Sequence, residues 1–251
     1  MLIPLFDIQA SILGYAPGTT DSAGAEELLA SAERLGITRT LVRREPEIGG
    51  TSDPMHANET IYAACEAHPG LVPCPIVVPN TAYDLPDETE QVADAIHHGA
   101  AAAYIRCGAD HWFAADWVSD NLFGAVSERA LPVYVGSETM SQRELATIAE
   151  RFPRLPIIYT QIDYRAQRTL LPLLETFPNI YASIGNPYNI HMGIEQIIER
   201  VGPTRLLFGT GFPGAEQTAA VTYLTYANIS EEEKALIGSA NMDRLIGAIQ
   251  E

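Results

Sequence analysis

Short apolar segments rich in β-branched residues alternate along the chain with longer amphipathic segments, and polar, Gly or Pro positions separate them. A short apolar run bounded by turn residues is typical of a buried strand, whereas apolar positions three and four residues apart indicate a helix. Eight segments fit the strand pattern: 2–8, 38–43, 72–78, 102–106, 132–135, 156–160, 179–184 and 205–209. A helical pattern follows each of them, and one further helix is predicted at about 231–248.

The glycines at the helix ends and the regular alternation favour a single domain built from repeated strand–helix units. Several helical patterns stop at a glycine, as in "ERLGI", "AHPGL" and "RVGPT", and no long linker interrupts the series. Eight such units in 251 residues match the size of a (β/α)8 TIM barrel. We therefore predict an α/β protein with one domain over 1–251, a TIM barrel with an extra C-terminal helix. A doubly wound open sheet is the alternative.

Residues 205–214, "RLLFGTGFPG", contain three glycines spaced as in a dinucleotide-binding loop. That fingerprint also needs an acidic residue that ends a second strand about 20 residues later. The acids at that distance, Glu231 to Glu233, follow Ser230 and precede "KALIG". Ser230 is therefore predicted to cap a helix whose first turn holds these acids, and no nucleotide cofactor is expected.

Composition and charge exclude several partners. The chain is 47% hydrophobic, yet it has no apolar stretch of membrane-spanning length and no signal-peptide pattern, which predicts a cytoplasmic protein without a membrane partner. A net charge of −17 would repel nucleic acid. Three cysteines without C-x-x-C spacing argue against a disulfide framework or a structural zinc site. Homo-oligomerisation is left open.

The glycine loop and the last helix resemble a known family. "RLLFGTGFPG" and "ISEEEKALIGSANMDRLIG" resemble the close of the amidohydrolase-related branch of the amidohydrolase superfamily, and Asn241, Arg244 and Leu245 fit that ending. "LFDIQASILG" and "LPVYVGSET" resemble the family's first and fifth strands. The branch includes metal-dependent hydrolases and aminocarboxymuconate semialdehyde decarboxylase. The resemblance implies a TIM barrel with its site at the C-terminal ends of the strands.

The family's metal ligands are missing from this chain. The resemblance implies Asp-x-His-x-His on strand one, a His at the end of strands five and six, and an Asp after strand eight. In this chain the corresponding residues are Asp7, Gln9, Ser11, Gly136, Gln161 and Gly211. Glycine offers no side-chain donor, and amides and hydroxyls are poor zinc ligands. We therefore predict one pocket where these residues meet, with no metal and no other cofactor.

Two other groups of residues suggest chemistry near the fourth strand. His111 lies in the loop after it and can line a pocket mouth, whereas the other five histidines fit surface or capping positions better. Cys107 stands beside Arg106, whose charge would lower the thiol pKa and make a nucleophile. A buried, unreactive thiol is the alternative.

Arginines at strand ends suggest recognition of an anion. Arg43 and Arg44 end the second predicted strand, and Arg106 ends the fourth, in a chain with only 15 Lys and Arg. Guanidinium groups suit a carboxylate or phosphate because they donate two parallel hydrogen bonds. Ion pairs with nearby acids such as Glu45 are the alternative.

Two functions remain open from the sequence. The first is a barrel protein that binds a small, anionic organic molecule at a metal-free site. The second is an enzyme that hydrolyses or decarboxylates a small carboxylic substrate by metal-independent acid–base chemistry. Candidate catalytic residues for the second are Asp7, His111, Asp163, Cys107 and Tyr164. The loss of the expected ligands favours the first.

Overall fold

The computed structural model describes residues 3–12, 23–45 and 53–250. Its strands are β1 Leu5–Ser11, β2 Ile37–Arg43, β3 Leu71–Pro73, β4 Ala103–Ile105, β5 Val133–Gly136, β6 Ile157–Thr160, β7 Ile180–Ile184 and β8 Leu206–Phe208. They pair in parallel and in chain order, as a three-stranded part from β1 to β3 and a five-stranded part from β4 to β8. Single bridges between Ile76 and Tyr104 and between Ala10 and Phe212 join the two parts into a ring. The predicted (β/α)8 barrel is therefore confirmed.

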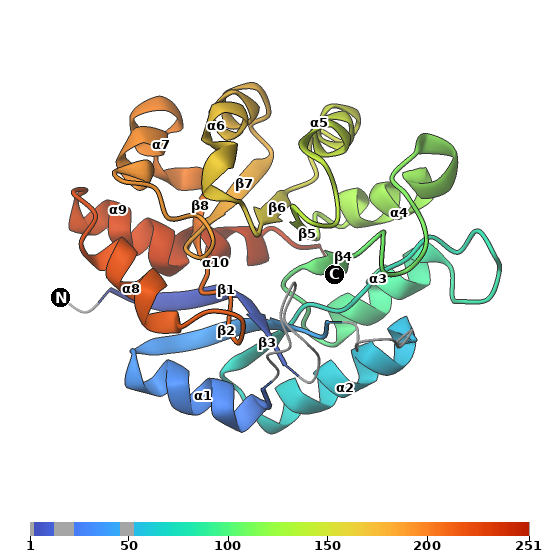
Figure 1. The fold of residues 1–251 in the computed structure, drawn as a ribbon. Helices are drawn as coiled ribbons and strands as arrows, with labels where there is room; N and C mark the ends of the chain where they lie inside the picture. Colours follow the sequence, from blue (N-terminus) through green and yellow to red (C-terminus); the bar gives the residue numbers. More distant parts are fainter. Residues whose placement is uncertain (1–2, 13–22, 46–52, 251) are drawn as a thin grey trace.

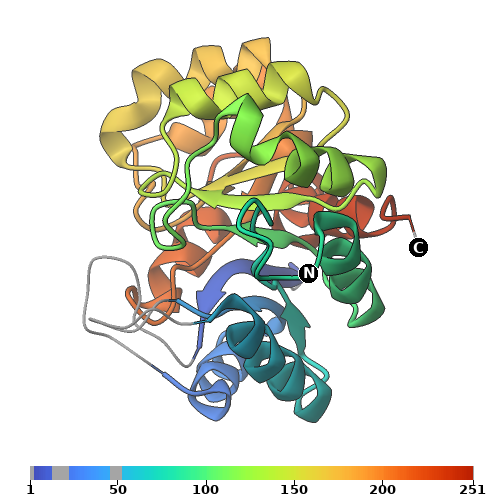
Figure 2. The same cartoon turned by 90° about the vertical axis from the view of Figure 1, so that its right-hand side faces the viewer.

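The helices surround the strands (Figure 1). They are α1 Ala25–Arg34, α2 Pro54–Ala67, α3 Glu88–His97, α4 Asp116–Glu128, α5 Gln142–Arg151, α6 Gln167–Thr176, α7 Gly193–Val201 and α8 Gln217–Thr225. Capping boxes at Asp87, Ser141 and Ser230 fix the starts of three helices, as the sequence predicted for Ser230. Figure 2 shows α1 and α2 (blue and teal) on one side of the strands and α4 to α7 (green to orange) on the other. Within the described residues, no helix is both long and apolar enough to cross a bilayer.

The barrel interior is a cluster of buried side chains drawn from many strands. Its members include Phe6, Ile8, Leu41, Tyr104, Tyr134, Ile158 and Leu207, with Met242 and Leu245 of the last helix. Side chains alternate between the two faces of a strand, so on β2 and on β4 to β8 the next inward positions toward the C-terminal ends lie two residues further on. On β1 the pairing shifts between Asp7 and Ala10, so Gln9 and Ser11 follow Ile8 on the inward face. We call this end of the barrel the mouth, and its inward residues are Gln9, Ser11, Arg43, Arg106, Gly136, Thr160, Ser183 and Gly209.

The third strand is much shorter than the predicted 72–78, because Pro73 and Pro75 cannot donate to a backbone ladder. Two helix side chains replace the missing strand neighbour. The Asn58 amide accepts from Ile76 N at 2.7 Å and donates to Ile76 O at 2.8 Å. The Gln91 amide accepts from Val78 N at 3.1 Å and donates to Val78 O at 3.0 Å. Side chains therefore complete the barrel where backbone pairing is thin.

Two other predicted boundaries are wrong. The first strand covers Leu5–Ser11 rather than 2–8, and its pairing with β2 shifts between Asp7 and Ala10. The predicted helix 231–248 is divided into α9 Glu231–Ala235, a π-helical turn Leu236–Ala240 and α10 Asn241–Ile246. The turn places Gly238 against the N-terminal segment, where a Cβ on Gly238 would lie 2.5 Å from the carbonyl oxygen of Pro4. The other strands agree with the sequence to within two residues at each end.

Candidate functional site

Asp7 lies between β1 and β8 rather than in the mouth. It is fully buried, and it faces outward between two inward residues, Phe6 and Ile8. Its Oδ1 accepts from Thr210 N at 2.9 Å and from Gln9 N at 3.0 Å. Its Oδ2 accepts from Thr210 Oγ1 at 2.5 Å and from Gln217 Nε2 at 3.3 Å. Four bonds fill the carboxylate's acceptor sites, so Asp7 joins strands and is not placed as an acid–base catalyst.

Burial nevertheless controls the charge of Asp7. Loss of contact with water raises the pKa of this carboxyl group, and the hydrogen bonds from Thr210, Gln9 and Gln217 only partly oppose that rise. The short contact with the Thr210 hydroxyl is typical of a charge-assisted bond.

Gln9 and Gly211 lie next to each other at the mouth. Gln9 Nε2 donates to Asn186 O at 2.9 Å, and Gln9 Oε1 accepts from Ser183 Oγ at 2.8 Å. A Cβ on Gly211 would lie 3.5 Å from Gln9 Nε2, and the φ angle of +83° at this position favours glycine. Gly209 is also required, because a Cβ there would lie 2.7 Å from the Gln9 Cβ. Gln9 thus occupies a close-packed neutral position between β1, β7 and β8.

Arg43 points into the mouth and is ion-paired. Its Nε lies 2.6 Å from Glu45 Oε1, and its Nη1 donates to Ala10 O at 3.0 Å. The guanidinium stands 4.6 Å from the centre of the Tyr134 ring and 5.5 Å from that of Tyr104. All of these side chains are buried. The neighbouring arginine, Arg44, instead donates to Thr60 Oγ1 of α2 at 3.1 Å, so Arg43 is the inward residue of this pair.

Tyr104 of β4 adds a hydrogen bond to the Arg43–Glu45 ion pair. Its hydroxyl donates to Glu45 Oε2 at 2.7 Å, and burial raises the pKa of this phenol well above its usual range, so the hydroxyl keeps its proton. Its ring packs edge to face against Tyr134 with centroids 5.5 Å apart.

Arg106 is also ion-paired. Its Nε and Nη2 each lie 2.9 Å from one carboxylate oxygen of Asp110, and only 2% of Arg106 is exposed. Burial raises the pKa of Asp110, and Arg106 opposes that rise. His111 is exposed, with a φ angle of +57°, and its charge also favours ionised Asp110. Both inward arginines therefore have carboxylate partners, as the ion-pair alternative required.

Cys107 does not have the environment of a nucleophile. Its side chain is buried, and burial raises the pKa of the thiol to about 12. The neighbouring Arg106 was expected to lower this pKa, but that expectation is wrong because its guanidinium is committed to Asp110. The alternative, an unreactive buried thiol, fits the structure.

Asp163 and Tyr164 form a surface turn after β6. Asp163 Oδ1 accepts from Arg165 N at 2.7 Å and so caps a 3₁₀ turn over Tyr164–Ala166. Tyr164 is 49% exposed, and the Arg165 guanidinium lies 4.5 Å from the centre of its ring. Both candidates are thus occupied in local contacts.

The strand-six position in the mouth is Thr160 rather than Gln161. Thr160 is fully buried and continues the inward face of Ile158. Gln161 follows the end of β6 with a φ angle of +53°, and its carbonyl accepts from the Ser137 hydroxyl. The alternation Ile158–Thr160 within "PIIYTQ" is the signal that identifies the inward residue.

Glu138 is a mouth residue that the sequence did not suggest. It lies two residues beyond Gly136, and its carboxylate folds back into the space that a Cβ on Gly136 would occupy. The Glu138 charge raises the pKa of Tyr104 and Tyr134, and the charge of Arg43 favours the ionised form of Glu138. The Glu138 carboxylate therefore interacts electrostatically with the group formed by Arg43, Glu45, Tyr104 and Tyr134, which we call the Arg43 cluster.

Two hydroxyls in the mouth have unused hydrogen-bonding capacity. Ser11 is fully buried and pairs in register with Arg43, and its Oγ has no hydrogen-bond partner among the described residues. The Tyr134 hydroxyl is also buried without a bond of normal geometry in this part of the chain. Burial raises the pKa of Tyr134 above its usual range, and the nearby Arg43 and Thr160 partly oppose this. Buried polar groups are nearly always bonded, so both hydroxyls suggest a missing partner.

The donors at the expected metal positions do not fit a metal ion of the zinc type. These positions hold two glycines, two amides and one hydroxyl: Gln9, Ser11, Gly136, Gln161 and Gly211. Across residues 3–12, 23–45 and 53–250, no three His, Cys, Asp or Glu side chains are grouped so that they could hold a metal ion.

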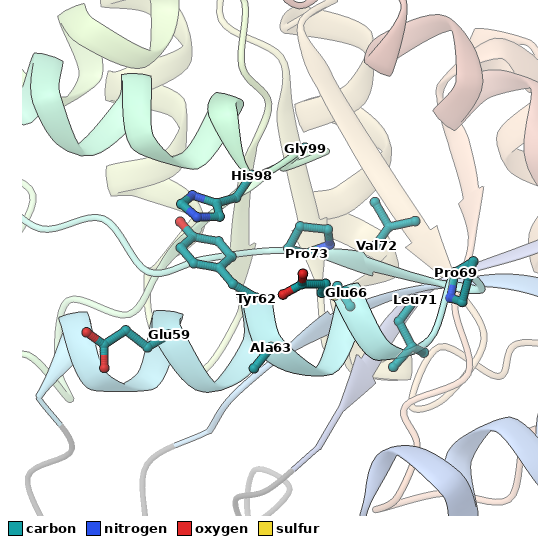
Figure 3. A pocket seen from close by; sticks show the side chains of 11 residues that line it. Glu59, Tyr62, Ala63, Glu66, Pro69, Leu71, Val72, Pro73, His98 and Gly99 are labelled. Atoms are coloured by element: carbon teal, nitrogen blue, oxygen red, sulfur yellow. The ribbon is translucent and has the colours of Figure 1, made fainter.

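A separate cavity of about 740 Å³ lies between α2 and the end of α3. Figure 3 shows Tyr62 and Glu66 on one helix and His98 above them. The Tyr62 and His98 rings stack with centroids 4.0 Å apart. Because α2 ends just before β3 begins, this cavity lies toward the N-terminal ends of the strands, and it is lined by none of the predicted site residues.

Three solved structures share the fold over nearly their whole length. One is 5-carboxyvanillate decarboxylase from Novosphingobium aromaticivorans, in complex with manganese and 4-hydroxy-3-methoxy-5-nitrobenzoic acid: TM-score 0.79, 12% identity, 97% of this chain and 96% of that chain covered. Another is 5-carboxyvanillate decarboxylase from Sphingomonas paucimobilis, with TM-score 0.74, 16% identity and coverage of 98% and 99%. The third is 2,6-dihydroxybenzoate decarboxylase from Rhizobium, with TM-score 0.72, 14% identity and coverage of 98% and 99%.

The sequence comparisons identify the family. No curated protein matches the sequence. A family model described as amidohydrolase matches residues 23–247, which include β2 to β8 and all of the helices α1 to α10. The chain therefore belongs to the amidohydrolase family.

Proposed function

We propose that this protein binds a small organic carboxylate in the mouth of its barrel, without a metal ion at the family's ligand positions. The Ser11 hydroxyl carries the proposal, because it is fully buried beside Arg43 and no described residue bonds to it. A ligand oxygen would supply the missing partner. Arg43 would attract the carboxylate, since guanidinium groups recognise carboxylates by charge-assisted hydrogen bonds.

The rings around Arg43 favour a planar ligand. Tyr104 and Tyr134 form a buried aromatic wall on the inward face, and aromatic side chains pack well against flat apolar surfaces. The related decarboxylases act, by their names, on aromatic carboxylates, which supports the same class of ligand here. We therefore expect an aromatic carboxylate.

The test is a calorimetric titration with 2,6-dihydroxybenzoate, with the uncharged 2,6-dihydroxybenzamide as its matched control. We expect saturable binding of one carboxylate per chain and weaker binding of the amide. Ser11→Ala should weaken carboxylate binding about three- to tenfold, the usual effect of one hydrogen bond. It should leave the free energy of unfolding unchanged or raised, because the hydroxyl makes no described bond that would be lost.

Ser119→Ala is the control variant, since Ser119 is equally buried but bonds to Ala115 O within α4. Binding should be unaffected by this change and by a chelator. Absence of saturable binding for benzoates of this kind, or its loss in chelator, would contradict the proposal.

A second candidate is an enzyme that acts on a small carboxylic substrate by metal-independent acid–base chemistry. Glu138 and Asp110 favour it, because burial raises the pKa of both carboxyl groups near the mouth. A carboxyl group with a raised pKa keeps its proton to a higher pH than a free carboxyl group does, which suits a general acid. Release of carbon dioxide from 2,6-dihydroxybenzoate, lost in Glu138→Gln, would favour this enzyme over the binding protein.

A further inference from the structure

One amino group of Arg43 remains for a ligand in the mouth. The Nε of Arg43 lies 2.6 Å from Glu45 Oε1, Nη1 donates to Ala10 O at 3.0 Å, and the Tyr134 ring centre lies 4.6 Å from the guanidinium carbon. The third nitrogen, Nη2, has no hydrogen-bond partner among the described residues. Ser11 pairs in register with Arg43 on the neighbouring strand, and its hydroxyl is unbonded in the same part of the chain. A ligand oxygen can therefore accept from Nη2 and from Ser11.

Glu45 is held beside Arg43 from two sides. Its side chain is 3% exposed, and its Oε2 accepts from the Tyr104 hydroxyl at 2.7 Å. The contact between Glu45 Oε1 and Arg43 Nε is close, but it lacks hydrogen-bond geometry, so the attraction is one between charges. A buried carboxylate fixed by a guanidinium and a phenol is costly to separate from its partners. We therefore expect Glu45 to stay in place when a ligand binds.

Two carboxylates would then share one guanidinium. A ligand carboxylate bonded to Arg43 Nη2 would meet a positive charge that Glu45 already balances at 2.6 Å. Repulsion between like charges is strong in a buried site, and it opposes part of the attraction to Arg43. An uncharged ligand of the same shape would not meet this repulsion. Glu45 therefore weakens the binding of carboxylates selectively.

We infer that Glu45 is a specificity-determining residue, which limits the preference of the mouth for carboxylates over neutral ligands of the same shape. The inference rests on the proposed function and adds the residue that sets the strength of that preference. Because Glu45 occupies the Nε side of Arg43, the ligand carboxylate binds through one amino group and not through two parallel hydrogen bonds. Much of the affinity then comes from the ring of the ligand.

The test compares 2,6-dihydroxybenzoate with 2,6-dihydroxybenzamide by calorimetry at neutral pH. The discrimination is the dissociation constant of the amide divided by that of the carboxylate. Glu45→Gln keeps the shape of the side chain and removes its charge. We expect the discrimination to rise about tenfold or more, because the carboxylate binds more tightly while the affinity for the amide stays within about twofold.

Three further variants make the result specific. Arg43→Met combined with Glu45→Gln removes both charges of the buried pair, which proteins often tolerate, and its discrimination should fall below that of the wild type. Glu45→Asp keeps a negative charge near Arg43 but retracts it from Nε, so the discrimination should rise severalfold. This variant decides the question if Glu45→Gln does not fold. Glu150→Gln changes an exposed glutamate of α5 and should behave as the wild type.

The outcomes separate this inference from the proposed function. If Glu45 only supported the structure of the mouth, its replacement would weaken both ligands alike. Unchanged or smaller discrimination in Glu45→Gln, or in Glu45→Asp where the first does not fold, would overturn the inference and leave carboxylate binding intact. Absence of carboxylate binding in the wild type and in every variant would overturn the proposed function and the inference with it. Carboxylate binding in Glu45→Gln alone would support the inference and overturn the proposed function of the natural chain.

Discussion

Asp7 joins two strands that share little backbone pairing. β1 meets the segment that follows β8 at the single bridge between Ala10 and Phe212, and close to it the Asp7 carboxylate accepts from both the amide and the hydroxyl of Thr210. Gln217 of α8 donates a further hydrogen bond to Asp7, so this carboxylate connects β1, the segment after β8 and α8. A buried acid with this many donors stabilises the fold through its acceptors rather than through its charge.

We expect Asp7→Ala to lower the free energy of unfolding by about 3 kcal/mol or more, because it leaves several buried donors unsatisfied. Asp7→Asn should cost less than about 1 kcal/mol if the amide can satisfy the same groups. Gln217 Oε1 is buried without a described partner, so a turn of the Gln217 amide would accept from the new NH₂ group. Urea unfolding measures both variants.

Asp163→Asn, in an exposed turn, is the control and should change the unfolding free energy little. Equal losses in Asp7→Ala and Asp7→Asn would show that Asp7 acts through its negative charge instead.

At the residue scale, the sequence identified the positions but not all of their roles. The spacing of Gln9, Gly136 and Gly211 placed them correctly at strand ends, because parallel strands converge there. Glu138 was missed because a turn, not a strand, carries its carboxylate back into the mouth, and such a turn leaves no periodic pattern. Asp7 was taken for a possible catalyst because the shift in β1 pairing between Asp7 and Ala10, which puts Asp7 on the opposite face from Gln9 and Ser11, cannot be read from residue types.

Among the elements, the segment after β3 depends most on side chains from elsewhere. Asn58 of α2 satisfies both backbone groups of Ile76, and Gln91 of α3 does the same for Val78. A side-chain amide can present a donor and an acceptor side by side, as the backbone of a neighbouring strand would. Two helices therefore hold this side of the barrel as well as cover it.

Asn58→Ala is expected to lower the free energy of unfolding by about 2–4 kcal/mol, since it leaves a buried donor and a buried acceptor unpaired. Asn58→Asp should cost at least as much, because its second oxygen would face the carbonyl of Ile76. The measurement is urea unfolding monitored by circular dichroism. Glu59→Ala, an exposed change on the same helix, is the control, and a similar loss there would indicate a general effect on α2.

Element boundaries were predictable where local chemistry decides them. Ser230 carries a capping box that can be read from sequence, and its helix begins as expected. The segment 72–78 looked like a strand because its residues are apolar, but its prolines remove two donors, and the donors of Ile76 and Val78 bond to the side-chain amides of Asn58 and Gln91. The division of the last helix depends on contact between Gly238 and Pro4, which lie at opposite ends of the chain.

For the whole molecule, the net negative charge and the burial of carboxyl groups both lower the free energy of unfolding as the pH rises. The chain carries a net charge of −17, so like charges repel in the compact state at neutral pH. Burial raises the pKa of Asp7 and Asp110, so the folded state holds their protons more tightly than the unfolded chain does. Stability from these groups is fully present below the ordinary carboxyl pKa of about 4 and is lost as pH rises through the raised values.

We therefore expect the free energy of unfolding to increase when the pH is lowered from about 8 to about 5.5. Urea unfolding at the two values measures the difference. Added salt at the higher pH should restore the share of the unfolding free energy that is lost through repulsion between exposed charges. Salt screens these charges and acts little on buried groups. Asp7→Asn should make the remaining pH dependence smaller. Greater stability at pH 8 than at pH 5.5 would contradict both effects.

The two single bridges that close the ring also determine how the molecule would come apart. They separate the strands into a group of three and a group of five, and few backbone hydrogen bonds hold the two groups together. The Arg43 cluster lies across one of these boundaries, since Arg43 and Glu45 belong to the first group and Tyr104 and Tyr134 to the second. Separation of the two strand groups along this boundary would therefore disrupt the mouth before any strand unfolds. A ligand that contacts both groups would stabilise the closed barrel against this separation.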